Sequence, residues 1–246
     1  MVGLRAFLSA WADEEWLFGQ LLVYRVGFYG PDLEENIALA SLAQDELGHA
    51  GLLADLFLPD QKARERHFLG RPAEEFSACR LVQVDLAEDW AAFVLRNYLY
   101  EEAEAVRLDW FGRAASGMPD LVGLMRREEA EHLAHWRHWV RLLAGDGEGR
   151  RRLIAAAGGV AELVGDVFYL PEGGRPQAFD GAELRTAWAA RVRAFFREVG
   201  LGPELDPLVG RLGRPPEAAG KHPDFFRVVE TMQSVYRSEP EAVTWG

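Results

Sequence analysis

Two stretches of the chain, QDELGHAGLL and REEAEHLAHW, place an acidic residue and a histidine on an otherwise apolar helical face. At spacings of three and four residues, the first stretch belongs to a row that is leucine except for Glu46 and His49. The second belongs to an apolar row interrupted by Glu129 and His132. Each pair is a Glu-x-x-His motif whose side chains share one face of a helix. Burying an ionised carboxylate is very unfavourable unless it is paired or bound to metal, so these motifs limit how the chain can fold.

Hydrophobic residues at helical spacing predict four long helices. The expected ranges are about 4–28, 33–57, 83–114 and 119–144. Pro31 and Asp32 suit the start of the second helix, because proline and a capping aspartate are both favoured there. A charged, proline-containing connector, residues 58–80, follows that helix. Four long helices of this kind are typical of an antiparallel bundle.

Three further helices are expected after the bundle, at about 150–168, 182–199 and 222–237. A Gly- and Pro-rich stretch that ends at Gly220 is interpreted as a loop. No segment has a convincing strand pattern, so the predicted fold class is all-α. We expect a single domain over residues 1–246, with a core bundle at about 4–144 and a C-terminal helical extension at about 150–246.

The composition narrows the expected partners and location. The chain carries 39 acidic and 27 basic residues, for a net charge of −12. Such a surface repels nucleic acid phosphates and anionic membranes, so neither is an expected partner. The sequence has no apolar run of about eighteen residues, the length that a transmembrane helix needs. Cys79 is the single cysteine, which excludes an intramolecular disulfide, and with no signal-peptide pattern we expect a cytoplasmic protein.

The other two bundle helices offer carboxylates at matching positions. In carboxylate-bridged dimetal bundles, two helices carry Glu-x-x-His and each of the other two adds one Glu. On the first helix Glu15 is the sole polar member of an apolar row, and Glu14 on the neighbouring row is the second choice. On the third helix Glu101 and Glu102 each interrupt an apolar row, and spacing alone does not separate them.

The predicted metal ligands are therefore four carboxylates and two imidazoles. They are Glu15, Glu46, His49, Glu101 (or Glu102), Glu129 and His132. Four negative charges balance two divalent cations, and mixed His and carboxylate ligands favour iron, with manganese as the alternative. Asp45 and Glu128 directly precede the motif glutamates, and an acidic residue there is expected to accept the second ring N–H of a ligand histidine.

Several segments resemble the multicomponent phenylacetyl-CoA epoxidase family, and the chain looks most like its PaaC-type subunit. The similar segments are LEENIALASLAQDELGHA, NYLYEE, EEAEHLAHWRHWVRLLAGDGE and FFRVVETMQSVYRSEPEAVTW. The QDELGH string also resembles the PaaA-type catalytic subunit. The resemblance implies a ferritin-like fold and, for the PaaA-type subunit, a diiron centre that epoxidises the ring of phenylacetyl-CoA with O2 and electrons from a reductase. The acidic ligand of that subunit in the segment matching NYLYEE favours Glu101 over Glu102.

The PaaC-type subunit of that family is usually described as a structural partner that has lost most metal ligands. This sequence departs from that pattern at Glu46, His49 and Glu129. We therefore expect a phenylacetyl-CoA epoxidase-type monooxygenase subunit with two iron ions and an aromatic acyl-CoA substrate. Its expected protein partners are a PaaA-type subunit or a second copy of the chain, and a reductase. The alternatives are a non-catalytic structural partner of the catalytic subunit and a ferritin-like iron-binding protein.

Overall fold

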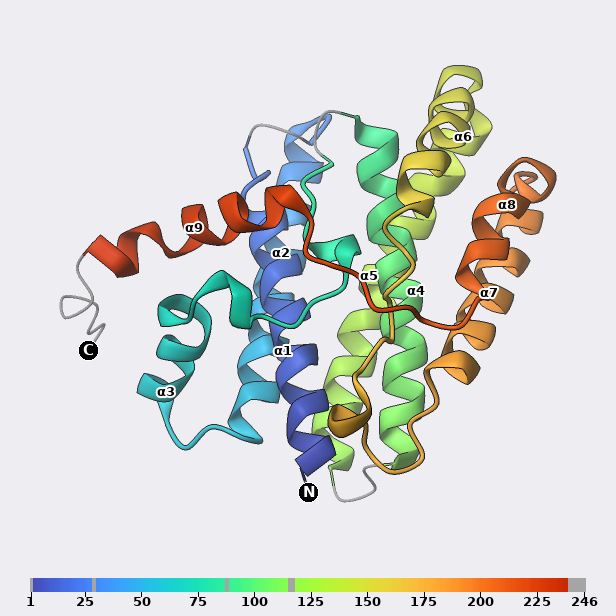
Figure 1. Cartoon of the computed structure of the whole chain (residues 1–246). Helices are drawn as coiled ribbons and strands as arrows, with labels where there is room; N and C mark the ends of the chain where they lie inside the picture. The colour runs from blue at the N-terminus through green and yellow to red at the C-terminus, as the bar shows by residue number, and fades with distance from the viewer. Residues whose placement is uncertain (1, 28–29, 87–88, 115–117, 239–246) are drawn as a thin grey trace.

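The computed structural model describes residues 2–27, 30–86, 89–114 and 118–238, and all regular elements within these ranges are helical. Four long helices form the central bundle (Figure 1). They are α1 (Val2–Val23), α2 (Leu33–Asp55), α4 (Trp90–Ala114) and α5 (Pro119–Gly145). Helix α1 packs on α2, and α4 packs on α5. The all-α prediction is confirmed, and the arrangement is consistent with a ferritin-like helical bundle.

The ends of these helices follow local sequence signals. The Asp32 carboxylate accepts a hydrogen bond from the Glu35 N–H at 2.8 Å, so it caps α2 at the predicted start. Helix α5 begins at Pro119, where the missing N–H of proline costs no helical hydrogen bond. Asp146 follows α5 and caps the next helix by accepting from the Gly149 N–H at 2.7 Å.

Gly19 lets α1 and α2 approach closely beside one of the motif glutamates. A Cβ atom at this position would lie 2.9 Å from Leu47 Cγ and 3.1 Å from the Cβ of Glu46. Both distances are too short for ordinary packing, so a larger residue would push the two helices apart here. The glycine thus helps to hold α2 within reach of carboxylates on α1.

The connector between α2 and α4 folds into short helical turns anchored on α1. They are α3 (Gln61–Glu65), a π-helical turn (Arg66–Gly70) and two 3₁₀ turns (Ala73–Glu75 and Arg80–Val82). Asp13 of α1 is fully buried and accepts hydrogen bonds from His67 Nε2 at 3.0 Å and the Ser77 N–H at 2.8 Å. Helix α4 begins at Trp90, not near residue 83 as predicted, because the chain before it forms a 3₁₀ turn.

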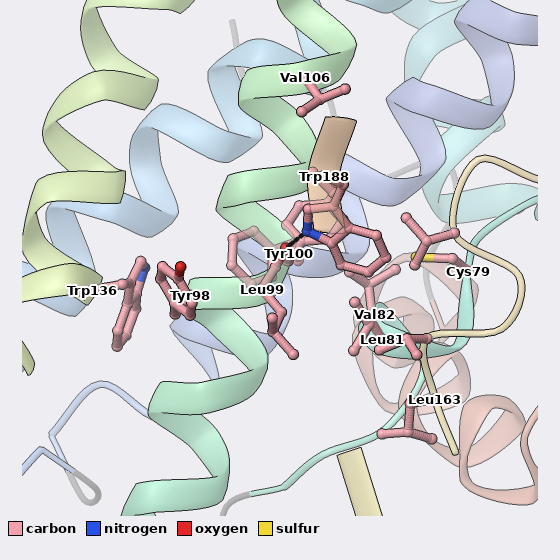
Figure 2. Packing of buried hydrophobic residues seen from close by; sticks show 14 of the residues in the cluster. Cys79, Leu81, Val82, Tyr98, Leu99, Tyr100, Val106, Trp136, Leu163 and Trp188 are labelled. Carbon is pink, nitrogen blue, oxygen red and sulfur yellow. Dashed lines mark hydrogen bonds between the residues drawn. The ribbon is translucent and has the colours of Figure 1, made fainter. Parts of the chain in front are cut away.

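Four more helices and a 3₁₀ turn (Glu172–Gly174) follow the bundle. The helices are α6 (Gly147–Ala161), α7 (Gly181–Glu198), α8 (Gly202–Leu212) and α9 (Pro223–Ser238). Figure 1 shows α7 and α8 on one side of the bundle, with α3 and α9 on the other. The indole N–H of Trp188 on α7 donates to the Leu99 carbonyl of α4 at 3.0 Å and joins the extension to the bundle core (Figure 2). Gln233 of α9 reaches the connector and donates to the Phe68 carbonyl at 2.9 Å.

Helix α8 corrects the prediction of a loop in the Gly- and Pro-rich stretch. Pro203 lies in its first turn, where proline is tolerated, although Pro207 lies inside the helix. Its buried residues recur at helical spacing and are Leu205, Leu208, Val209 and Leu212. Burial of this apolar face therefore outweighs the breaker residues. The fifth predicted helix also ends earlier than expected, at Ala161.

Among the described residues, none of the helices combines the length and the apolar character that crossing a membrane would require.

Candidate metal centre

Six side chains from the four bundle helices meet in the interior of the bundle. Glu15 comes from α1, Glu46 and His49 from α2, Glu101 from α4, and Glu129 and His132 from α5. None of the six is more than 3% exposed. Four carboxylates in so small and dry a space repel one another strongly unless positive charge lies between them.

The six residues divide into two groups that share Glu46 and Glu129. One group adds Glu15 and His49, and the other adds Glu101 and His132. Within each group, one oxygen or nitrogen atom per residue lies within 4.8 Å of all the others. Two neighbouring ions could therefore be held with two carboxylates in common.

Each shared carboxylate presents one oxygen to each histidine. Glu46 Oε1 lies 3.1 Å from His132 Nδ1, and its Oε2 lies 3.9 Å from His49 Nδ1. Glu129 Oε1 lies 3.1 Å from His49 Nδ1, and its Oε2 lies 4.0 Å from His132 Nδ1. This arrangement is what a pair of bridging carboxylates needs.

The outer nitrogen of each imidazole is held by an acidic residue on the opposite helix. His49 Nε2 donates to Glu128 Oε2 of α5 at 2.8 Å. His132 Nε2 donates to Asp45 Oδ2 of α2 at 3.2 Å. Because each Nε2 is engaged with a carboxylate, both Nδ1 atoms face the cluster. The sequence predicts that Asp45 and Glu128 accept such bonds, and in the structure each of the two hydrogen bonds joins α2 to α5.

The two alternative ligand candidates point to arginines instead. Glu14 forms an ion pair with Arg107 and accepts from the Cys79 N–H at 2.8 Å. Glu102 accepts from Arg191 Nε at 2.8 Å and from the guanidinium of Arg137. Their negative charges are already paired, whereas Glu15 and Glu101 lie in the two groups described above.

Several atoms of the cluster are buried without a hydrogen-bond partner. They are Glu15 Oε2, Glu46 Oε2, His49 Nδ1, and both carboxylate oxygens of Glu101 and of Glu129. Leaving so many polar atoms unsatisfied is costly, and native structures rarely do it. Oxygen atoms with neutral imidazole nitrogen are a ligand set for divalent iron or manganese, so these residues fit a dimetal group.

A model of the phenylacetic acid catabolic protein family, PaaA_PaaC, matches residues 3–245. The chain belongs to the phenylacetic acid catabolic protein family. The match spans nearly the whole chain and places it in phenylacetate catabolism, and the same family model covers both PaaA-type and PaaC-type subunits. A search of curated proteins gave no match.

The pKa shifts differ between the carboxylates and histidines of the cluster. Burial and then the charge of Glu129 raise the pKa of Glu46 well above its usual range, and the same two causes raise the pKa of Glu101. Burial alone would raise the pKa of Glu15 and lower that of His49. At Glu15, contacts with His49, Glu46 and Glu104 outweigh burial, and its pKa falls to about 2. At His49, contacts with Glu129 and then Glu15 outweigh burial, and its pKa rises to about 11. Without metal, protons on the cluster therefore supply part of the missing positive charge.

Three buried residues around Glu15 were not predicted. Trp11 Nε1 lies 2.8 Å from Glu15 Oε1 and 2.7 Å from Glu104 Oε2, and donates to both. The Tyr100 hydroxyl donates to the same Glu15 oxygen at 3.4 Å. These donors leave Glu15 Oε2 facing the cluster. The only sequence signal was the position of Trp11, four residues before Glu15 on one helical row.

The remaining histidines of α5 lie outside the cluster. His135 Nε2 lies 3.1 Å from Glu35 Oε1, and Trp139 Nε1 donates to the other oxygen of Glu35 at 2.7 Å. His138 is exposed. The Glu35 contacts join the first turn of α2 to α5.

Proposed function

We propose that this chain is a metal-binding subunit of a phenylacetyl-CoA epoxidase-type monooxygenase, with a carboxylate-bridged site for two iron ions. The observation that carries the proposal is the sharing of Glu46 and Glu129 between two ligand groups, each completed by one further glutamate and one histidine. Four carboxylates and two neutral imidazoles balance two divalent ions. Manganese is the alternative metal for the same ligands.

The proposed roles follow from the contacts of each side chain. Glu15 and His49 would hold one ion, and Glu101 and His132 the other, with Glu46 and Glu129 common to both. Glu128 and Asp45 would fix the ring orientation of the two histidines. The bound iron would supply oxygen activation, and the apolar walls of the bundle exclude water from the site. Electrons would come from a separate reductase, since the sequence has no nucleotide-binding fingerprint.

Anaerobic loading with ferrous iron tests the proposal. We expect about two iron ions per chain and an oxygen-dependent absorption change after exposure to O2. Glu46→Gln and Glu129→Gln each remove a shared ligand and should leave fewer than about one tightly bound ion. Glu131→Gln is the matched control, because Glu131 is exposed on the same helix as Glu129. Iron well below two per chain in the unchanged protein would contradict the proposal.

Two other functions would use the same fold. A structural partner would help a PaaA-type subunit to bind its acyl-CoA substrate without doing chemistry itself. Turnover by the assembled complex would then be unchanged by Glu46→Gln, whereas our proposal expects its loss with the complex still assembled. A ferritin-like iron oxidase would consume ferrous iron repeatedly without any organic substrate, whereas our proposal expects sustained O2 use to require an aromatic acyl-CoA.

A further inference from the structure

A cavity of about 220 Å³ lies on the side of α1 that carries Glu14, close to the candidate metal centre. Its lining comes from α1, the connector, the segment of residues 166–179, Arg107 of α4, and Ala219 and Lys221 before α9. Trp11 lines this cavity while its N–H reaches Glu15 of the metal-ligand cluster. The cavity and the cluster therefore share one side chain.

Aromatic rings form much of the cavity wall. They are Phe7, Trp11, Phe76, Phe168, Tyr169 and Phe179. The ring of Phe7 is tilted against two of the others, with its centre 5.6 Å from that of Trp11 and 5.7 Å from that of Phe179. Such walls favour another ring, because aromatic groups prefer offset and edge-to-face contacts. A cavity of about 150 Å³ is large enough for benzene, so this one has room for a substituted single ring.

The charged groups of the cavity are already engaged with protein atoms. Arg107 forms ion pairs with Glu14 and, at 2.7 Å, with Glu104. Lys221 donates to the Phe76 carbonyl. The two cations are matched in number by the carboxylates of Glu14 and Asp166 in the same lining, so the cavity has no net positive charge to compensate an anion. The ligand that suits it is neutral.

We propose that this cavity binds a neutral, single-ring aromatic group and that its occupancy strengthens metal binding through Trp11. A ring packed on the indole would restrict its motion and keep its N–H directed at Glu15 Oε1. Glu15 Oε2, which has no hydrogen-bond partner, would then stay turned toward the cluster. The binding of the ring stands on the cavity alone, whereas the coupling rests on the proposed metal site.

Ring binding is tested by titrating metal-free protein with benzyl alcohol and measuring binding by ligand-observed NMR. We expect saturable binding, and at least about tenfold weaker binding of benzoate, a free-energy difference of about 1.4 kcal/mol. Ala10→Phe fills the cavity from α1 and should weaken benzyl alcohol binding to a similar degree. Val23→Phe adds the same ring at an exposed position of α1 and should bind like the unchanged protein.

Phe179→Trp enlarges a wall ring and serves as a second blocking variant if Ala10→Phe does not fold. Equal affinity for benzoate and benzyl alcohol, or undiminished binding in the blocking variants, would overturn the proposed site. These results do not depend on metal, so they are separate from a failure of the dimetal proposal.

The coupling is tested by titrating Co²⁺ as a spectroscopic probe with and without saturating benzyl alcohol. We expect the alcohol to raise Co²⁺ affinity about threefold or more in the unchanged protein and in Val23→Phe. Trp11→Phe keeps a ring but loses the N–H, so it should bind the alcohol without any change in Co²⁺ affinity. The same increase in Trp11→Phe, or no increase in the unchanged protein, would overturn the coupling.

Discussion

The outer ring N–H of His49 on α2, at Nε2, donates a hydrogen bond to Glu128 Oε2 of α5 at 2.8 Å, so a histidine of one Glu-x-x-His helix is oriented by the other helix. The reciprocal bond joins His132 of α5 to Asp45 of α2 at 3.2 Å. Each imidazole is thus fixed by the helix that carries the opposite motif. The two motifs form one interdependent unit.

Removing these outer carboxylate charges should weaken metal binding. We expect Glu128→Gln and Asp45→Asn each to lower metal affinity about 10- to 100-fold, since partners of ligand histidines have effects of this size. Metal titration with Co²⁺ or anaerobic Fe²⁺ measures the change. Glu131→Gln on the exposed face of α5 should leave the affinity unchanged. An unaltered affinity in both outer variants would show that the two histidines do not need this support to bind metal.

Substitution of the adjacent glutamates Glu101 and Glu102 of α4 should have different effects on metal binding and on stability. Glu101→Gln should abolish tight binding of one of the two ions, because Glu101 belongs to only one ligand group. Glu102→Gln should retain both ions but lose about 1–3 kcal/mol of unfolding free energy, since Glu102 is fully buried against Arg137 and Arg191. The stability loss is smaller than for a fully buried pair, because both arginines are 31–37% exposed.

Metal content and chemical denaturation on the same two variants make this comparison. Full metal binding by Glu101→Gln, with loss in Glu102→Gln, would reverse the assignment.

Glu46→Gln should change the unfolding free energy in opposite directions in the metal-free and the iron-loaded protein. In metal-free protein, burial and neighbouring carboxylates raise the pKa of Glu46. The folded state therefore loses stability as the pH rises above the ordinary pKa of a glutamate, where the unfolded chain is already ionised. Glu46→Gln removes this penalty and should raise the unfolding free energy by about 1–2 kcal/mol at neutral pH. In iron-loaded protein the same change removes a shared ligand and should lower it. Denaturation with and without chelator checks both signs, and a loss of stability in both states would contradict the account.

Asp166 lies outside the candidate metal centre and should make the unfolding free energy depend on pH. Burial raises the pKa of Asp166 from 3.8 to about 6, despite a hydrogen bond from the Arg80 N–H. Because the folded state holds this proton more tightly, the penalty is absent below about pH 4, grows as the pH rises and is complete above about pH 6. Asp166→Asn keeps an oxygen acceptor for Arg80. Its unfolding free energy, relative to the unchanged protein, should improve by about 2–3 kcal/mol between pH 4 and pH 8.

This pH series uses metal-free protein, so that loss of metal at low pH does not change the measured unfolding free energy. A relative stability that is flat with pH would show that Asp166 has an ordinary pKa.

Helical periodicity was enough to predict the bundle and the two Glu-x-x-His motifs. Both depend on residues close in sequence, and an i, i+3 pair shares a helical face wherever the helix lies. Glu15 and Glu101 were harder to separate from Glu14 and Glu102, because all four are buried next to apolar residues. Glu14 and Glu102 differ from the other two because arginines from other helices pair with them, such as Arg191 of α7 with Glu102. The spacing of residues in a single sequence does not contain that information.

The same limit explains the residues that were missed. Glu104 is one of several glutamates in a short acidic run, and its burial depends on Trp11, 93 residues away, and on Arg107. Helix α8 was not predicted, because its prolines locally favour a loop. The helix forms because the rest of the fold buries its four-residue apolar face. In both cases tertiary contacts decide the outcome.

The most direct test of the account is anomalous X-ray scattering from crystals of the iron-loaded protein, recorded on both sides of the iron absorption edge. We predict two iron ions per chain, one beside Glu15 and His49 and the other beside Glu101 and His132, with Glu46 and Glu129 in contact with both. No iron in the bundle, a single ion, or ions held by Glu14 or Glu102 would contradict it.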